Sequence, residues 1–492
     1  MNLDKKIERN YDDLSRSDLQ KRLARLARIC ENLEIPVLVM VDGFESSGKG
    51  YVINSITSEL NPKYFDVEVF EKDVDNEDCY PFEKRFFENV PKKGHIKIFD
   101  RSIYYKIFDD LDISKKDLEK RIASLEKMEK MLYDDQTIVI KFFLNIDKKE
   151  QTKRIEKLEG SKQKSFYLTK SDKKQNKNYE DYQKHFEEIL EKTNFKFSPW
   201  NIIDSTDLKE GSIEALYQML ESLTIGIERV STQRQDNENI ERSYDRDVKI
   251  VENLDLSKTI SKDEYKEKKD KLQKEVRDLL FDFYNRGIST VLVFEGVDAA
   301  GKDGAIERLI KEVDPRLYTV HAISAPSKDE LDHHYLWRFY TKLPKDGYVG
   351  IFSRSWYGRV MVERVEGFAK VNEWDRAYDE ILEMEKQIYN HGSLILKFFV
   401  TIDKDEQLER FKARENEPDK NYKITDEDWR NRDKWDSYIK AMDEMLDRTD
   451  VDYAPWIIVE GNQKHYARIK VMEEFVKHAK EHLEKLEKNK DK

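Results

Sequence analysis

Cysteine is scarce in this sequence, with only Cys30 and Cys79 among 492 residues. Neither lies in a spacing typical of a metal site or a redox motif, so no disulfide framework is expected and the reducing cytoplasm is the expected location. No run of about 18 apolar residues occurs, so no membrane-spanning helix is expected. The first residues, MNLDKKIERNYDDL, lack the apolar centre of a signal peptide. The sequence predicts a cytoplasmic protein without a membrane segment.

An excess of basic charge is also lacking. The chain has 89 Lys and Arg against 101 Asp and Glu, which gives a net charge of −12. This balance argues against a nucleic-acid partner, because nucleic-acid-binding domains are usually basic. It leaves room for a polyanionic substrate, since a local basic groove can concentrate one. At this length, two or three domains are expected.

An internal repeat is the most informative feature that is present. The stretch IPVLVMVDGFESSGKGYVINSI at Ile35–Ile56 recurs as ISTVLVFEGVDAAGKDGAIERL at Ile288–Leu309. Both copies have the pattern of a strand, a loop and a helix. Lys49 and Lys302 stand at matching places, 253 positions apart. The repeat predicts two copies of one domain rather than two unrelated domains with similar loops.

Further blocks recur in the same order, first at the same offset and then at an offset of 256. Gln151 and Arg154 match Gln407 and Arg410 at the later offset. The three blocks are FDRSIYY (99–105) with FSRSWYG (352–358), IVIKFFLNID (138–147) with LILKFFVTID (394–403), and TNFKFSPWNIID (193–204) with TDVDYAPWIIVE (449–460).

The fold class predicted for each half is α/β, with a parallel sheet that carries helices on both faces. Short apolar strands such as VLVF, VGIF and LILKFFV alternate with helical patterns, which is typical of such sheets. We expect a first domain at 1–225, a polar linker at 226–249 and a second domain at 250–492. Ser261 is a predicted cap of the helix that leads into the second domain.

The stretch EGVDAAGKDG in the second half has the pattern of a phosphate-binding loop between a strand and a helix. Gly296, Gly301 and Lys302 fit this pattern, and Gly304 follows. Glycines allow the backbone to approach a polyphosphate, and Lys302 would contact its oxygens. The next residue is Asp303 rather than the usual Ser or Thr. The alternative is an ordinary glycine turn between a strand and a helix.

An acid inside the loop offers another way to hold a metal. Asp298 would repel phosphate unless a cation lay between them, and Mg²⁺ prefers carboxylate and phosphate oxygens. Asp298 is therefore a candidate Mg²⁺ ligand, although an acid near a helix start is also favoured by the helix dipole. The first-half copy has Glu45 at this place and also lacks Ser or Thr after its lysine.

The segment FSRSWYGRVMVERVEGF at Phe352–Phe368 follows a predicted strand. Arg354 and Arg359 are fixed positive charges that would neutralise a transferring phosphoryl group. Glu363 is a candidate metal ligand or proton acceptor. Each residue alone is better explained as a member of a surface ion pair, whereas the nearby loop favours a functional role for the three together.

A charged stretch, ARENEPDKNYKITDEDWRNRDKWDSY at Ala413–Tyr438, mixes basic, acidic and aromatic residues. We predict a helical lid over the phosphates, with a solvated helical face as the alternative. Trp429 and Trp435 within it are expected to be packing residues.

Taken together, these motifs resemble the second family of polyphosphate kinases, in particular its tandem two-domain type, the polyphosphate:AMP phosphotransferases. The resemblance rests on GVDAAGKDG, SRSWYGRVMVERVEGF, KFFVTIDKDEQLERF and DEDWRNRDKWDSYIKAMDEMLDRTDVDYAPWIIVEGN, and it extends more weakly over the first half. It implies a P-loop kinase fold with a helical lid. It also implies Mg²⁺-dependent phosphoryl transfer between inorganic polyphosphate and a nucleotide, with AMP converted to ADP.

The resemblance also implies roles for single residues of the second half. The loop acid and lysine of the family match Asp298 and Lys302. Its arginines and further acid match Arg354, Arg359 and Glu363. These residues are the expected catalytic set, with Asp298 and Glu363 as metal ligands.

One departure from the family pattern is Ser353, where the usual segment has an Asp that serves as a metal carboxylate. We expect this change to weaken Mg²⁺ binding or to shift the burden to Asp298 and Glu363.

The first half departs in the opposite way, which favours the second half as the catalytic one. It keeps Asp100, Arg101 and Lys49, but it has Ile103 instead of Trp. Lys106 and Asp110 lie near the places of the second Arg and the Glu.

Two other functions remain open from the residues alone. One is an ATP-dependent nucleotide kinase of the thymidylate-kinase type, which shares the P-loop architecture. The other is a non-catalytic polyphosphate- or nucleotide-binding protein with degenerate loops, which Ser353 favours. A homo-oligomer is compatible with the sequence.

Overall fold

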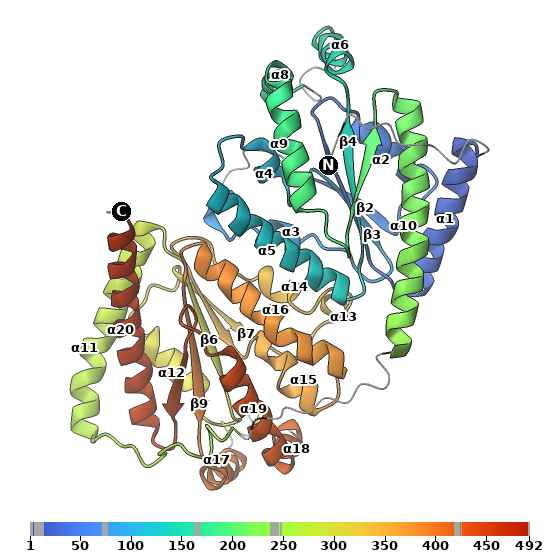
Figure 1. Ribbon diagram of the computed structural model, residues 1–492. Coiled ribbons are helices and arrows are strands. Elements are labelled where there is room, and N and C mark those ends of the chain that lie inside the picture. Colours follow the sequence, from blue (N-terminus) through green and yellow to red (C-terminus); the bar gives the residue numbers. More distant parts are fainter. Residues whose placement is uncertain are drawn as a thin grey trace. The chain divides into compact units, whose positions relative to one another are not determined.

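The computed structural model of the chain describes residues 3, 14–70, 77–161, 168–236, 246, 248–417, 424 and 426–490. Two compact units are present, one around strands β1–β5 and the other around strands β6–β10 (Figure 1). The segment Lys328–Trp337 groups with the first unit, and the described residues 77–84 group with the second. The two-domain organisation expected from the repeat is thus present, with short exceptions.

The first half of the chain forms a sheet and the helices that cover it. Its strands are β1 (Val37–Gly43), β2 (Phe65–Val69), β3 (Ile96–Asp100), β4 (Ile138–Asn145) and β5 (Trp200–Asp204). Its helices are α1 (Arg16–Asn32), α2 (Lys49–Thr57), α3 (Lys84–Phe87), α4 (Tyr105–Asp109), α5 (Lys115–Asp134), α6 (Lys148–Glu159), α8 (Lys170–Lys177), α9 (Tyr179–Lys192) and α10 (Leu208–Asp236), with a 3₁₀ turn η1 at Glu77–Cys79.

The second half repeats this order. Its strands are β6 (Thr290–Gly296), β7 (Tyr318–Ala322), β8 (Val349–Ser353), β9 (Leu394–Thr401) and β10 (Trp456–Glu460). Its helices are α11 (Lys262–Arg286), α12 (Lys302–Leu309), α13 (Lys328–Leu331), α14 (Trp337–Tyr340), α15 (Val362–Val365), α16 (Val371–Asn390), α17 (Lys404–Asn416), α18 (Asp426–Asp433), α19 (Trp435–Thr449) and α20 (Lys464–Lys490), with a 3₁₀ turn η3 at Trp356–Arg359.

Both sheets have the same topology. The strand order is β2-β3-β1-β4-β5 in the first and β7-β8-β6-β9-β10 in the second. Every pairing between these strands is parallel, as the sequence predicted. The strands that carry the two loops, β1 and β6, lie in the centre, so each loop opens at the carboxyl edge of its sheet. Ligands of open parallel sheets bind at that edge.

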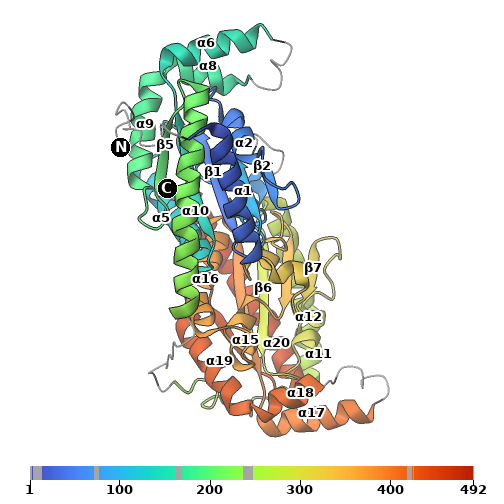
Figure 2. The ribbon, with the colours of Figure 1, turned by 90° about the vertical axis from the view of Figure 1, so that its right-hand side faces the viewer.

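Helices cover both faces of each sheet, and this explains why the central strands are buried and mostly apolar. All eight residues of β9 are buried, and β1 and β6 are buried up to their final glycines. In the first unit α1, α2 and α10 pack together, and α5 packs against β4 (Figures 1 and 2). The helices α11, α12 and α20 pack in the matching way in the second unit.

The start of the second domain agrees with the sequence, because the Ser261 side chain accepts a hydrogen bond from the backbone of Glu264 and caps α11. The expected linker at 226–249 differs, since α10 continues to Asp236. Gly226 and Val230 of that stretch are buried. Arg229 donates to the backbone oxygens of Tyr133 and Thr137 at 2.8 Å each, and these contacts hold the helix on its own domain.

The remainder of the expected linker, 237–249, falls mostly outside the described residues. Among the helices that the structure describes, none is both long and apolar enough to cross a membrane.

Candidate functional site

The loop between β6 and α12 has the backbone shape that its glycines predicted. Gly296 has a φ of 129°, and a Cβ atom there would lie 1.9 Å from the carbonyl oxygen of Val400 on the neighbouring strand β9. Gly301 caps α12 in the left-handed region with a φ of 106°. Only glycine readily adopts these positive φ angles, and only glycine leaves room for the neighbouring strand at Gly296. The close approach of loop and strand therefore requires the glycines of the sequence pattern.

Lys302 lies over this loop from the first turn of α12. Its Nζ donates to the backbone oxygens of Gly296 and Val297 at 2.8 and 3.1 Å. Burial lowers the pKa of Lys302, and the charge of Asp298 opposes that shift. These contacts hold the ammonium group at the mouth of the loop, where it would attract a phosphate oxygen.

Asp298 and Arg354, which the sequence analysis assigned to one candidate site, are in contact at the rim of the loop. Arg354 Nη2 donates to Asp298 Oδ1 at 3.2 Å. Arg354 follows β8 in a left-handed conformation with a φ of 63°, which is uncommon for a residue with a side chain. Such conformations persist where the surroundings enforce them and they gather at functional sites. The equivalent Arg101 of the first half has the same φ, 63°.

A buried acid beneath the loop fixes the Arg354 segment. The Ser355 hydroxyl donates to Glu295 Oε1 at 2.7 Å, and Arg354 N donates to Phe294 O at 3.0 Å. Burial raises the pKa of Glu295, and the Ser355 hydrogen bond opposes that shift. These contacts connect the end of β8 to the end of β6 and explain how Arg354 keeps its unusual backbone.

The other predicted residues of this half fall into three separate pairs. Arg359 Nη1 pairs with Glu363 Oε2 at 3.2 Å, one helical turn apart. Ser353 Oγ donates to Asp303 Oδ1 at 3.0 Å. Gly304 lies beside Arg468 of α20, whose Nη2 would be 3.2 Å from a Cβ atom at this glycine.

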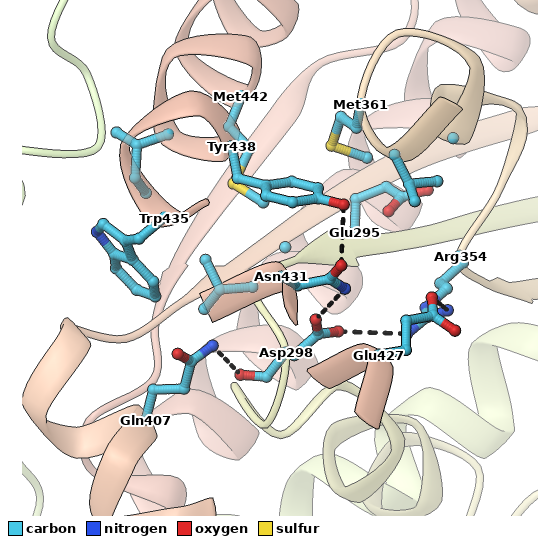
Figure 3. Close-up of a pocket in the computed structure, with 15 residues that line it drawn as sticks. Glu295, Asp298, Arg354, Met361, Gln407, Glu427, Asn431, Trp435, Tyr438 and Met442 are labelled. Atoms are coloured by element: carbon cyan, nitrogen blue, oxygen red, sulfur yellow. Dashed lines mark hydrogen bonds and ion pairs between the residues drawn. The ribbon is translucent and has the colours of Figure 1, made fainter. Parts of the chain in front are cut away.

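A cavity that is open to solvent lies above Asp298 and Arg354, with about 640 Å³ of space that includes its open mouth (Figure 3). Its polar floor includes these two residues, Glu295 and Gln407. Its largely apolar wall is formed by Met361, Val362, Trp435, Tyr438, Ile439 and Met442. A cavity with an apolar wall and a few convergent polar groups is the usual form of a small-molecule site.

Helices α18 and α19 supply the lid side of this cavity, as the charged stretch predicted. Asn431 Nδ2 donates to Asp298 Oδ2 at 2.9 Å, so the lid contacts the loop directly (Figure 3). Trp435 lines the cavity, which differs from the packing role expected for it. Trp429 does pack, with its ring centroid 5.2 Å from that of Phe411. Residues 418–423 and 425 of the predicted lid lie outside the described part of the chain.

Two residues that the sequence marked only as repeat matches support the loop from below. Gln407 Nε2 donates to the backbone oxygen of Asp298 at 3.2 Å. Arg410 donates to four backbone oxygens at 2.7 to 3.0 Å, those of Ala299, Ala300, Gly461 and Asn462. Their identical offset in the repeat was the only signal in the sequence that singled them out.

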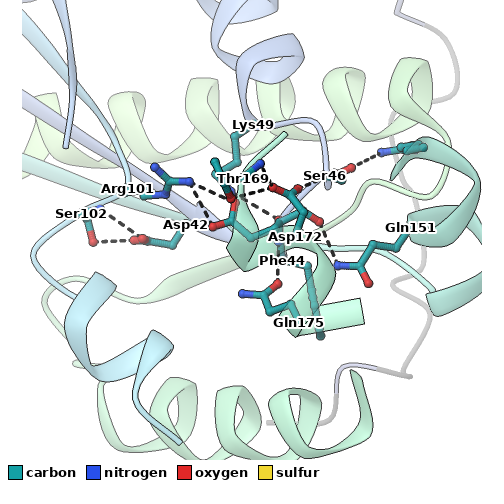
Figure 4. A network of polar contacts seen from close by, with 12 residues as sticks. Asp42, Phe44, Ser46, Lys49, Arg101, Ser102, Gln151, Thr169, Asp172 and Gln175 are labelled. Carbon is teal, nitrogen blue, oxygen red and sulfur yellow. Dashed lines mark hydrogen bonds and ion pairs between the residues drawn. The ribbon is translucent and has the colours of Figure 1, made fainter. Parts of the chain in front are cut away.

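The first half has a tighter version of the same site (Figure 4). Glu45 pairs with Lys49 at 3.3 Å and with Arg101 at 3.1 Å. Its loop is also held from below, since Gln151 donates to Glu45 O at 2.9 Å and Arg154 to Ser47 O at 2.9 Å. The cavity at this loop measures about 290 Å³, less than half of its counterpart.

Asp42 and Asp100 add buried acids to the first site. Ser102 donates to Asp42 through its amide at 3.1 Å and through its hydroxyl at 2.5 Å. Burial raises the pKa of Asp42 to about 6 and also raises the pKa of Asp100.

A buried ion pair underlies each site. Lys397 Nζ lies 2.8 Å from Glu385 Oε2, and both side chains are fully buried. Tyr357, in the segment after Arg354, donates to Glu385 Oε1 at 2.8 Å, and Trp356 Nε1 does so at 3.1 Å. The first half repeats the pair with Lys141 and Glu129 at 3.1 Å.

A divalent metal would find the Asp298 carboxylate at the loop rim. The described residues contain no group of three or more His, Cys, Asp or Glu side chains that could hold an ion by themselves. Phosphoryl-transfer sites commonly bind Mg²⁺ through one or two carboxylates and complete its shell with substrate phosphates and water. The donor set fits a metal that arrives with its substrate.

Comparison with known proteins is consistent with this geometry. The sequence matches the polyphosphate kinase 2 family over residues 6–230 and again over 259–487. The chain belongs to the polyphosphate kinase 2 family. Both halves of this polyphosphate kinase 2 protein carry the family domain, so the repeat seen in the sequence is a tandem of that domain.

Two similar proteins match over nearly the full chain. A polyphosphate:AMP phosphotransferase of Pseudomonas aeruginosa is 37% identical over 450 residues, which cover 90% of each chain. One of Acinetobacter johnsonii is 34% identical and covers 96% of each chain. A crystal structure described as a polyphosphate kinase 2 from Pseudomonas aeruginosa PA01 superimposes with a TM-score of 0.84 at 32% identity, covering 98% of each chain. The fold of both halves is therefore shared with that crystal structure.

Proposed function

We propose that the chain transfers a phosphoryl group from inorganic polyphosphate to AMP and thereby produces ADP, with the second half as the active site. The observation that carries this proposal is the cavity above Asp298 and Arg354, which joins a phosphate-binding loop to an apolar wall. The names of the full-length relatives support polyphosphate and AMP as the substrates.

The nucleotide would lie with its base against the apolar wall and its phosphate toward the loop. Trp435, Ile439 and Met442 form that wall. The reacting phosphates lie between Lys302 and Arg354, whose positive charges offset the charge of the transferring group. Arg359 and Glu363 belong to the same proposed catalytic set.

The transfer needs no covalent enzyme intermediate. An oxygen of the AMP phosphate attacks the terminal phosphorus of polyphosphate, and a new P–O bond forms. The P–O bond to the remaining polyphosphate breaks, and its electron pair stays with that shortened chain. The transition state is loose, so positioning and charge neutralisation supply most of the rate enhancement.

Mg²⁺ is the proposed cofactor, with Asp298 as its protein carboxylate. Bound Mg²⁺ supplies positive charge to the phosphate oxygens. Glu363 was the second predicted ligand, and its 3.2 Å pair with Arg359 would have to open before it reached a metal. The cytoplasm remains the proposed location, since two cysteines in 492 residues provide no disulfide framework. A homo-oligomer remains a proposal that light scattering would test.

The deciding experiment measures ADP formed from AMP with Mg²⁺ and either polyphosphate or ATP as the donor. We expect ADP from polyphosphate, loss of the reaction in EDTA, and little product with ATP. ADP formed only with ATP would replace the proposal by an ordinary nucleotide kinase. Tight polyphosphate or AMP binding without turnover would replace it by a binding function.

A further inference from the structure

Glu366, directly after α15, is a buried acid whose hydrogen bonds and ion pairs come from the lid. Its side chain is 6% exposed, and Lys434 Nζ lies 2.9 Å from its Oε2. Arg430 Nε lies 3.4 Å from the same oxygen, and the Tyr438 hydroxyl lies 3.2 Å from Oε1. These partners belong to α18, α19 and the residue between them. A buried carboxylate is costly without such partners, so Glu366 holds the lid helices in place.

The same tyrosine continues the contact to the loop. The Tyr438 hydroxyl donates to Asn431 Oδ1 at 3.0 Å and shares its one proton with Glu366 Oε1, and Asn431 Nδ2 donates to Asp298 Oδ2 at 2.9 Å (Figure 3). Arg354 donates to the other oxygen of Asp298. Glu366, Tyr438, Asn431 and Asp298 therefore form one chain of contacts, which we call the lid relay.

The segment that contains Glu366 differs in length between the two halves. Tyr104 and Tyr357 match at an offset of 253, whereas Lys115 and Val371, which begin α5 and α16, are 256 apart. The second half therefore has three extra residues in the segment that contains Glu366.

The lid of the first half contacts its loop in another way. Ser46 Oγ donates to Asp172 Oδ1 at 2.6 Å, and Glu45 N donates to Gln175 Oε1 at 2.7 Å (Figure 4). The carboxylate of Glu45 is held by Lys49 and Arg101 rather than by a lid amide. The relay thus distinguishes the half that we propose to be catalytic.

We propose that Glu366 is a positioning residue for phosphoryl transfer, acting through Tyr438 and Asn431 to keep the lid on the loop and to orient the Asp298 carboxylate. This inference rests on the proposed function. Outer hydrogen bonds that orient a metal-binding carboxylate commonly matter 10- to 100-fold, by order of magnitude, for metal affinity or activity. The relay also places the apolar wall of α19, because Tyr438 belongs to that wall.

The kinetic test compares Glu366→Leu, Glu366→Gln and the matched control Glu409→Gln, which alters an exposed glutamate on α17. We expect Glu366→Leu to raise both the Mg²⁺ concentration for half-maximal rate and the KM for AMP by about 10-fold or more. Glu366→Gln removes the charge and keeps only one accepting oxygen, so its values should fall between those of the Leu variant and wild type. The control should match wild type. Equal values in all four proteins would overturn the inference.

A double variant tests whether the contacts form one relay. Tyr438→Phe removes the hydroxyl, and its effect on KM should not add to that of Glu366→Gln, because both changes break the same chain. Full additivity of the two effects would contradict the relay.

Hydrogen–deuterium exchange gives a readout that does not depend on activity. We expect Glu366→Leu to increase deuterium uptake in α18 and α19 while α8, α9 and α16 keep the wild-type rate. Unchanged uptake in the lid, or increased uptake throughout the second half, would overturn the inference. Should wild-type protein form no ADP, the proposed function fails, and the exchange experiment still decides whether Glu366 holds the lid.

Discussion

The Ser353 hydroxyl donates a hydrogen bond of 3.0 Å to Asp303 Oδ1. In the first half the matching positions are Asp100 and Gly50, each 253 residues earlier. Each half therefore has one acid in this pair of positions. In the second half the acid is Asp303, and in the first half it is Asp100. The carboxylate that Ser353 lacks is present on the residue to which it donates.

The first prediction concerns Ser353→Asp. The new carboxylate would lie next to that of Asp303, and their repulsion should destabilise the metal-free protein by about 1 kcal/mol, or roughly 2–4 °C in Tm. A cation relieves such repulsion, so Mg²⁺ should raise the Tm of the variant more than that of wild type. Asp303→Gly in the same chain should remove the difference. An identical response of Ser353→Asp and wild type to Mg²⁺ would contradict this prediction.

The second prediction separates the two loops. Lys302→Ala should reduce ADP formation by at least about 100-fold, since one preorganised charge at a reacting phosphate commonly contributes that much. Lys49→Ala should retain most of the transfer, because Lys49 is engaged by Glu45 beside the smaller cavity. The measurement is the initial rate with saturating polyphosphate. The reverse order of effects would place the active site in the first half.

The third prediction concerns the support below the loops. Arg410→Lys cannot reproduce a guanidinium fork, so the four backbone oxygens that Arg410 contacts would lose most of their donors. We expect kcat to fall by about 10- to 100-fold, because small misplacements of reacting groups have effects of that size. Arg154→Lys makes the same change in the first half and serves as the control. Equal losses of kcat in the two variants would refute a specific role for the second loop.

The fourth prediction follows from a difference between the buried pairs. Trp356 Nε1 donates to Glu385, whereas the first half has Ile103 there and instead the Ser198 hydroxyl donates to Glu129. Ala454 occupies the position that matches Ser198. Trp356→Phe should destabilise the protein by about 1–3 kcal/mol, because the lost bond is to a buried charge.

Adding Ala454→Ser to Trp356→Phe should recover part of that loss, since it supplies the hydroxyl used in the first half. Chemical denaturation of the single and double variants measures both steps. A further loss of stability in the double variant would show that the two donors are not equivalent.

The fifth prediction concerns pH. Burial raises the pKa of Asp42 to about 6, above the usual range of an aspartate, so the folded protein binds the proton more tightly than the unfolded chain. The associated stability is fully present below the unfolded pKa and is lost as the pH rises through about 6. Between pH 5 and pH 8 the loss should be about 1 kcal/mol. Asp42→Asn should therefore show a flatter dependence of Tm on pH, and parallel curves would contradict the assignment.

Much of the fold was predictable because short stretches of sequence determine its strands, helices and loops. Alternating strand and helix patterns gave the parallel sheets, Ser261 gave the start of α11, and Gly296 with Gly301 gave the loop. The end of α10 was not predictable in this way, because the polar stretch after 225 is held in a helix by Arg229 and Gly226 against distant parts of the same domain.

The candidate site was predictable as a set of residues but not as a set of contacts. The motifs gave Asp298 and Arg354, and the structure joins them directly. The role of Trp435 in the cavity and the support from Arg410 depend on elements more than 100 residues from the loop. No pattern within a short window reports such proximity.

The sequence by itself determined that one α/β domain occurs twice and that each copy has an acid, a lysine and an arginine at matching places. The repeat shows that the domain occurs twice. Glycine spacing and apolar periodicity are sufficient to predict its loops, strands and helices, because local backbone geometry imposes both patterns. Only the tertiary structure decided which charges neutralise one another. Glu45 is engaged by Lys49 and Arg101, whereas Asp298 meets Arg354 and the lid amide of Asn431. Packing brings these side chains together from distant segments, and electrostatic interactions are significant only over the short distances that packing sets.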